Sequence, residues 1–213
     1  GLTAMLDRAM DAMEKAAAGP PLVPPGLPLD LFVTVTDYWG ANTLLPIHSP
    51  PAVTEREHRR LFAFQSPPIT MHDPSPRAVA GDRPELLFAA RATASFPGAF
   101  PPACITEIDR RMAQTGRAWP HRAAFVASQL AGDRPPEEVL LIDGSVLNNA
   151  PFGPAIAAVR LRIANREVDR RFVYVDPKPG VAGPLDMDDR QPGFFTAMFR
   201  AMADIPRAQP IRD

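Results

Sequence analysis

The residues with the clearest chemical potential lie in the run from Leu140 to Phe152, where an apolar segment ends in Asp143-Gly144 and continues past two asparagines into a helical pattern. An aspartate in this position is expected to project from the carboxyl end of a buried strand, where open α/β sheets keep their ligand-binding and catalytic groups. Gly144 would permit the tight turn, because a residue without Cβ can take positive φ without strain. Ordinary turn chemistry explains the same pair, so both interpretations stay open at this point.

Two further aspartates end apolar runs: Asp37 follows residues 29–36, and Asp176 follows residues 172–175. Three carboxylates at strand ends are the hard oxygen ligands that Mg²⁺ prefers, as in a magnesium-dependent phosphohydrolase. Alternatively, one aspartate is functional and the other two only end their strands. The four histidines, His48, His58, His72 and His121, have no metal-ligand spacing, and nucleotide-binding glycine loops are absent. The histidines therefore give no support to a metal site, which would rest on the three aspartates alone, and no nucleotide cofactor is predicted.

The hydrophobic pattern predicts the elements that would position these side chains. Apolar residues from Leu2 to Met13 recur at helical spacing and predict an amphipathic helix that faces the core and ends before Gly19-Pro20. Strands are predicted at 29–36, 60–65, 139–142 and 172–175, and helices at 85–91, 155–163 and 193–203. The last two strands and the helix between them would form a parallel, right-handed strand-helix-strand unit. Residues 106–137 lack clear periodicity and are a candidate surface insertion.

Composition bounds the classes of protein and partner. With 213 residues and 46% hydrophobic content, the chain can bury one substantial core. The 23 Lys and Arg against 24 Asp and Glu leave no basic field for nucleic acid. Cys104 is the single cysteine, and neither a signal-peptide pattern nor an apolar run of about 18 residues is present. We expect a cytoplasmic or peripheral membrane protein, whose oligomeric state the sequence leaves open.

Three ordered blocks resemble patatin-like phospholipases. Asp143 to Pro151 is similar to the DG[GA]-x-x-x-N-x-P block of that family. Ala90 to Pro102 is similar to its A-x-x-A-S-x-x-P-x-x-F-P-P segment, and Leu31 to Asp37 followed by Gly40 resembles a strand that ends in T-D before a glycine. The order and rough spacing of the blocks agree across residues 29–155.

The resemblance implies a single three-layer α/β/α hydrolase domain over residues 1–213 with a mostly parallel central sheet. It implies a lipid acyl hydrolase, of the phospholipase A or esterase type, that acts on a lipid or phospholipid ester with a Ser-Asp dyad and no cofactor. Asp143 would be the general base that takes the serine proton directly. The remaining site residues would be Gly144, Ser145, Asn148 and Asn149 in the active-site loop and Phe96 and Phe100 along an acyl channel.

The departures from the family pattern concern the nucleophile. Position 145 is serine where the family usually has glycine or alanine. No two of the 13 glycines are four residues apart, so the GxSxG elbow that carries the family's serine is absent from this sequence. The resemblance thus implies the carboxyl-side part of a catalytic domain, inactive alone, with its serine upstream. Ser95 is the other serine in a matched block, and its hydroxyl is expected to bind loop backbone. The alternative to an enzyme is a non-catalytic patatin-like module that binds lipid or a partner.

Overall fold

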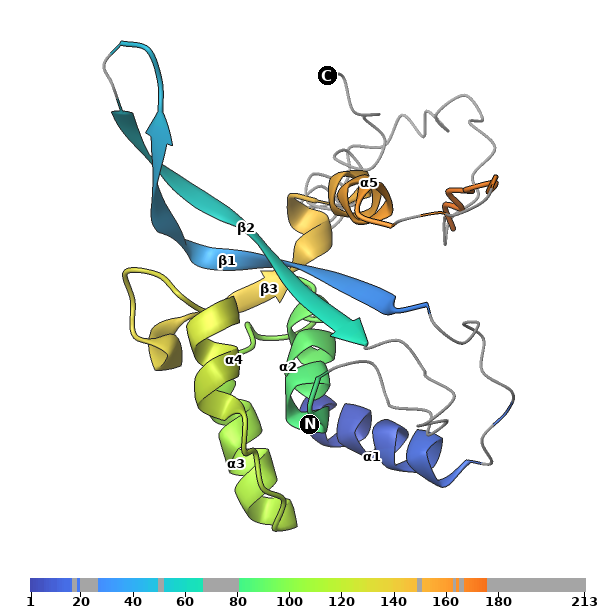
Figure 1. The fold of residues 1–213 in the computed structure, drawn as a ribbon. Coiled ribbons are helices and arrows are strands. Elements are labelled where there is room, and N and C mark those ends of the chain that lie inside the picture. Colours follow the sequence, from blue (N-terminus) through green and yellow to red (C-terminus); the bar gives the residue numbers. More distant parts are fainter. Residues whose placement is uncertain are drawn as a thin grey trace, which may run out of the picture. The chain divides into compact units, whose positions relative to one another are not determined.

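A computed structural model of the chain describes residues 1–16, 19, 27–49, 52–66, 81–148, 151–162, 164 and 167–175. The chain divides into two compact units, Gly1–Ala155 and Ile156–Asp213. The first unit contains a three-stranded sheet and four α-helices among its described residues (Figure 1). All three sequence blocks singled out above belong to this unit.

The sheet is built on a long hairpin. Strand β1 (Leu29–Pro46) pairs antiparallel with β2 (Ala52–Ser66), and β3 (Leu141–Asp143) pairs antiparallel with the other edge of β1, giving the order β2-β1-β3. The prediction of a mostly parallel central sheet in an α/β/α sandwich is therefore wrong for the described residues. A pattern of apolar residues indicates that a segment is a strand, but it specifies neither its neighbour nor their relative direction.

The predicted strand-helix-strand unit is also wrong in its second strand. Its first strand is β3, and its helix is α5 (Phe152–Arg160). Phe172 to Val175, however, is exposed and has no regular structure. Their apolar character alone predicts a buried strand. An apolar run becomes a strand, however, only where a neighbouring strand is available for pairing. The predicted helix at 193–203 lies outside the described residues.

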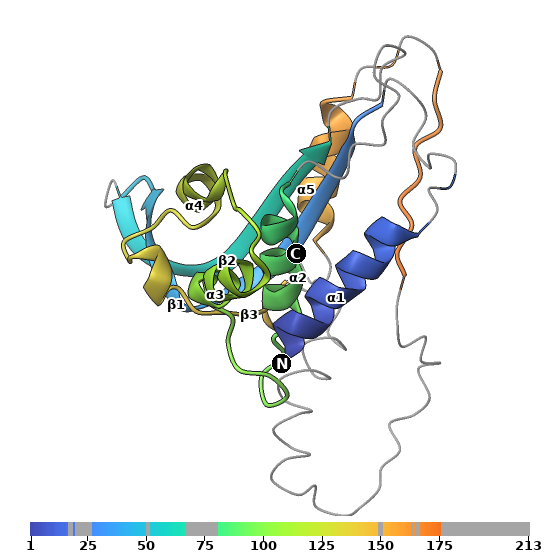
Figure 2. The same ribbon diagram turned by 90° about the horizontal axis from the view of Figure 1, so that it is seen from below.

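Three helices cover one face of the sheet. Figures 1 and 2 show α2 (Arg83–Thr93), α3 (Ile105–Thr115) and α4 (Arg122–Gln129) on the same side of β1 and β2. Phe62 of β2, Phe88 of α2 and Phe125 of α4 meet there, with ring centroids 5.7 to 6.1 Å apart. Because α4 and all of α3 except Ile105 fall within residues 106–137, the segment considered as a surface insertion supplies core side chains, including Ile108 and Met112.

Helix α2 begins with a complete capping box. The Glu85 carboxylate accepts a hydrogen bond of 3.1 Å from the backbone N–H of Asp82, and Asp82 caps the helix in return. Burial raises the pKa of Glu85 above its ordinary value. This cap fixes where α2 starts, and therefore where its last turn and the following loop meet the sheet.

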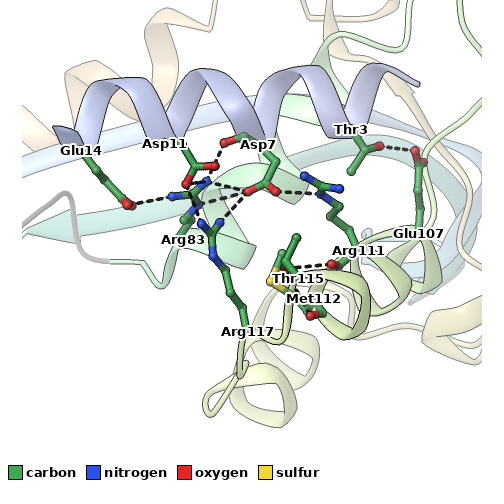
Figure 3. A network of polar contacts seen from close by, with 10 residues as sticks. All are labelled: Thr3, Asp7, Asp11, Glu14, Arg83, Glu107, Arg111, Met112, Thr115 and Arg117. Atoms are coloured by element: carbon green, nitrogen blue, oxygen red, sulfur yellow. Dashed lines mark hydrogen bonds and ion pairs between the residues drawn. The ribbon is translucent and has the colours of Figure 1, made fainter. Parts of the chain in front are cut away.

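Helix α1 (Leu2–Lys15) is held against α2 and α3 by ion pairs (Figure 3). Asp7 is fully buried and contacts Arg83 of α2, Arg111 of α3 and Arg117, at 2.7, 2.7 and 2.9 Å. Burial by itself would raise the pKa of Asp7, but the hydrogen bonds from Arg83 and Arg111 outweigh it and hold this pKa below its ordinary value. The face of α1 toward the protein is therefore partly ionic.

The second unit is described only in part. Helix α5 begins at Phe152, before the boundary between the units, and runs to Arg160. Arg170 donates hydrogen bonds to the carbonyl oxygens of Val159 and Arg162, at 2.9 and 2.6 Å. Among the described residues of both units, the helices are too short or too polar to span a bilayer.

Candidate active site

Asp143 is the last residue of β3, and its main chain is held from two directions. On one side it lies opposite Val35 of β1, and its carbonyl oxygen accepts a hydrogen bond of 3.0 Å from the Thr36 hydroxyl. On the other side its backbone N–H donates to the carbonyl oxygen of Ser95, at 3.1 Å, in the loop after α2. Strand and loop together fix the point from which the Asp143 side chain leaves the sheet.

The carboxylate of Asp143 is half-buried and has one oxygen engaged. Oδ1 accepts a hydrogen bond of 2.8 Å from the backbone N–H of Ser145 and so caps the short 3-10 helix η2 (Gly144–Val146). Oδ2 has no hydrogen-bond partner within the described part of the chain. A carboxylate oriented through one oxygen and open at the other has the arrangement required of a proton acceptor.

Gly144 has a different function from the one expected. Among the described residues, positive φ occurs only at Gly40, Gly98 and Gly116, so the turn after Asp143 does not need it. A Cβ at position 144 would instead collide with the carbonyl group of Thr34 in β1. Glycine is required here because the backbone of η2 passes directly against β1.

The rest of the predicted loop is held by main-chain contacts. Ser145 supplies the N–H that binds Asp143, and Asn148 donates its backbone N–H to the carbonyl oxygen of Gly144 at 2.8 Å. The anticipated loop-orienting role of the Asn148 side chain stays a prediction. Asn149 lies outside the described residues.

Ser95 is fully buried and its hydroxyl is occupied. Oγ donates a hydrogen bond of 2.8 Å to the carbonyl oxygen of Arg91 and accepts one from the Arg91 guanidinium. The hydroxyl was expected to bind loop backbone; it binds backbone, but the carbonyl belongs to the last turn of α2. Because the hydroxyl both donates and accepts a hydrogen bond inside the core, the environment of Ser95 indicates a structural role.

Arg91 is a site residue that the sequence reasoning missed. Its buried guanidinium donates to the carbonyl oxygen of Pro101 at 3.1 Å and pairs with Glu107 at 3.2 Å, in addition to Ser95. It thereby ties the last turn of α2 to both ends of the loop that borders β3. The available signal was the spacing of Arg91 and Ser95, which are four residues apart across the predicted end of the helix, a separation that brings side chains close together.

The loop from Ser95 to Ala103 runs along the outer edge of β3. Ala103 and Leu141 exchange two backbone hydrogen bonds, of 2.8 and 2.9 Å. Within this loop Phe96 is partly buried and Phe100 is exposed. Both rings therefore belong to the segment that contacts Asp143, and their role as walls of an acyl channel stays a prediction.

Asp37 has a structural environment. Its carboxylate is buried and accepts hydrogen bonds from the backbone N–H groups of Trp39 and Gly40, at 3.1 and 3.0 Å, and from Arg60 at 2.9 Å. These bonds stabilise the bulge at which the β1–β2 register shifts, where Gly40 has a φ of 69°. The Asp37 carboxylate thus has a structural role in the bulge.

The three-aspartate metal site finds no support in the described residues. Within these ranges no group of three His, Cys, Asp or Glu side chains is arranged to hold a metal ion. Both carboxylate oxygens of Asp37 accept hydrogen bonds from the bulge and from Arg60. Asp176 lies outside the described residues. Of the two strand-end aspartates that the structure describes, Asp143 is the one with a carboxylate oxygen that has no hydrogen-bond partner in this part of the chain.

Comparison with known proteins gives one distant similarity. Over 183 residues the chain is 28% identical to an uncharacterized membrane protein, Rv3479, of Mycobacterium tuberculosis; the alignment covers 82% of this chain and 15% of that protein. The chain thus corresponds to a small part of the length of this relative. No protein-family model and no solved structure matches the chain significantly.

Proposed function

We propose that these residues supply the general base and the active-site loop of a patatin-like lipid acyl hydrolase, which cleaves carboxylic esters of lipids. One observation carries the proposal. The three blocks that resemble this family lie far apart in the sequence, yet two of them, through Thr36 and Ser95, bind the main chain of Asp143 in the third. Segments that form one catalytic site are expected to meet in this way, whereas three chance similarities have no reason to.

In the proposed reaction, the oxygen of a serine attacks the ester carbonyl while Asp143 Oδ2 takes the serine proton. The tetrahedral intermediate collapses to an acyl-serine, and the protonated aspartate gives its proton to the departing alcohol. Water then attacks the acyl-serine while Asp143 takes the water proton, and this proton passes to the departing serine oxygen as the fatty acid is released. The hydrogen bond from the Ser145 N–H to Oδ1 orients the carboxylate and leaves Oδ2 as the oxygen that would accept the serine proton.

The serine itself is proposed to belong to a GxSxG segment outside these 213 residues. The much greater length of the mycobacterial relative leaves room for such a segment, and its description as a membrane protein agrees with a lipid substrate. The proposed chemistry uses no metal or organic cofactor.

The test uses the longest natural polypeptide that contains these residues. We expect Asp143→Asn to lower the turnover of a lipid ester by about 10² to 10⁴, the range for loss of a general base, because an amide cannot accept the serine proton. Asp133→Asn, an exposed aspartate, serves as the matched control and should leave turnover unchanged. Near-normal turnover in the Asp143 variant would refute the dyad.

A non-catalytic lipid-binding module is the second candidate, and the same polypeptide separates it from the enzyme. A fluorophosphonate probe forms a covalent bond with an activated serine. Labelling of one serine supports the hydrolase. Absence of labelling, together with binding of intact lipid, would replace it with the binding module.

A further inference from the structure

The β1–β2 hairpin continues well past the part that carries the core. Beyond the bulge at residues 37–40, the outer segments 41–46 and 52–57 form strand pairs only with each other among the described residues, and Asn42, close to the bulge, donates a side-chain hydrogen bond of 2.8 Å to Asp133. Figure 1 shows this end of the hairpin away from α2, α3 and α4. Its apolar side chains are accordingly exposed: Leu44 is 68% exposed, Leu45 39%, Ile47 43% and Val53 40%.

The part of this hairpin nearest its turn carries no charged side chain. No Asp, Glu, Lys or Arg occurs from Tyr38 to Thr54, although 22% of the whole chain is charged. Solvent-exposed strands are normally protected by charged side chains, which also prevent association with other strands. An exposed ribbon that carries leucines and no charged side chains is therefore a candidate surface for burial in an apolar environment.

Both faces of the ribbon are apolar. Successive residues of a strand point to opposite faces, so Leu44 and Leu45 lie on different sides. Leu45 is paired with Val53, which adds a second apolar side chain to its face. A protein partner would cover one face and leave the other in water, whereas the interfacial layer of a membrane surrounds an inserted tip from all sides.

We propose that the end of this hairpin, residues 44–49 and 52–53, inserts into the interfacial layer of a lipid bilayer. The depth is limited by the backbone, since a two-stranded ribbon directs about half of its peptide groups outward, where they need water or headgroups as partners. The charges that follow the tip, Glu55, Arg56, Glu57 and Arg59, are mixed in sign. Insertion therefore depends on apolar contact and does not require anionic lipid.

This inference deepens the proposed function, because it names the element that would bring Asp143 to a membrane-borne ester, but its test measures binding alone. The chain is mixed with phosphatidylcholine vesicles and sedimented at low and high salt. We expect binding that salt barely changes. We expect Leu44→Asp/Leu45→Asp to weaken the partition by more than about tenfold, because it removes two inserted apolar side chains. The matched control is Met5→Asp/Met13→Asp, which places the same charges at exposed apolar positions of α1, and it should bind like the unmodified chain.

Three outcomes would overturn the inference: no binding to these vesicles, equal binding of the two double variants, or binding only to anionic vesicles and only at low salt. Loss of self-association in the Leu44/Leu45 variant, without any vesicle binding by the unmodified chain, would instead identify a second copy as the occupant. Circular dichroism and thermal unfolding establish that both variants are folded. If vesicles bind but the longer polypeptide shows no esterase activity, the proposed function fails while this inference stands.

Discussion

The backbone N–H of Asp143 donates a hydrogen bond of 3.1 Å to the carbonyl oxygen of Ser95. Through this bond, the loop after α2 and the end of β3 form one unit, although 48 positions separate the two residues in the printed sequence. The Ser95 side chain points into the core and binds Arg91. Ser95 therefore positions Asp143 through its main chain, and its hydroxyl has no role in the proposed chemistry.

Ser95→Ala tests that assignment. In the longer polypeptide, we expect this variant to keep fluorophosphonate labelling, because its hydroxyl is not the nucleophile. It should lower the free energy of unfolding by about 1 to 3 kcal/mol, since a buried guanidinium N–H and the Arg91 carbonyl lose their partner. Loss of labelling with unchanged stability would mean that Ser95 is the nucleophile.

Gly144→Ala should destabilise the protein. The added Cβ would overlap the main chain of Thr34, which cannot move without shifting β1, so we expect a loss of about 1 to 3 kcal/mol. Gly153→Ala is the control, because a Cβ there meets nothing within 4 Å and lies in α5. It should leave the free energy of unfolding equal or slightly higher. Urea unfolding measures the stability of the two variants. Equal stabilities would show that η2 can move away from β1.

Asp7→Asn should be strongly destabilising at neutral pH. The change leaves Arg83, Arg111 and Arg117 without their shared buried carboxylate, and removal of one partner from a buried ion pair costs about 3 to 5 kcal/mol. Glu14→Gln removes a pair with Arg83 at an exposed position, and should cost less than about 1 kcal/mol. Urea unfolding at pH 7 measures both.

The Asp7 carboxylate also predicts that the free energy of unfolding falls at acid pH. Because the pKa of Asp7 is lower in the folded state, its contribution is fully present above its ordinary value of 3.8 and is lost as the pH falls through the lower, folded-state value. The unmodified chain should thus lose more stability between pH 5 and pH 2 than Asp7→Asn does. An equal loss in the two proteins would mean that other carboxylates cause the acid unfolding.

The 213-residue chain by itself should hydrolyse no ester. Acyl transfer needs both a nucleophile and an oxyanion hole, and the GxSxG segment that would carry the nucleophile is absent from the sequence. A short p-nitrophenyl ester gives a sensitive assay. Robust turnover by the purified chain would place the serine within these residues and refute the proposed division of the site.

Much of the local structure could be predicted from the sequence. The helix at the start of the chain, the strands around residues 29–36, 60–65 and 139–142 and the helices near 85–91 and 155–163 are all present. Helical and strand periodicities reflect the geometry of a single segment, so one sequence is enough to detect them. The helices within residues 106–137 were missed; α4 is short, and the stripe on α3 is limited to Ile105, Ile108 and Met112.

The face of α1 shows where local patterns fail. The sequence predicts that the stripe including Met5, Leu6, Met10 and Met13 faces the core. In the structure Leu6 and Met10 pack against the core, whereas Met5 and Met13 are exposed and Asp7 is buried. An aspartate can be buried here because three arginines from distant segments surround it. The residues next to Asp7 in the sequence do not predict these arginines.

The sequence by itself determined most of the segments of the first unit and the absence of a GxSxG elbow, and its resemblance to a known family is the source of the proposal for Asp143. Tertiary structure alone decided that β1, β2 and β3 run antiparallel, that Gly144 is required by its approach to Thr34, and that Arg91 and Ser95 hold the loop beside Asp143. The physical reason is the range of the interactions. Periodicity and turn chemistry act over a few residues, whereas strand direction, steric contact and buried charge depend on segments that only the folded chain brings together.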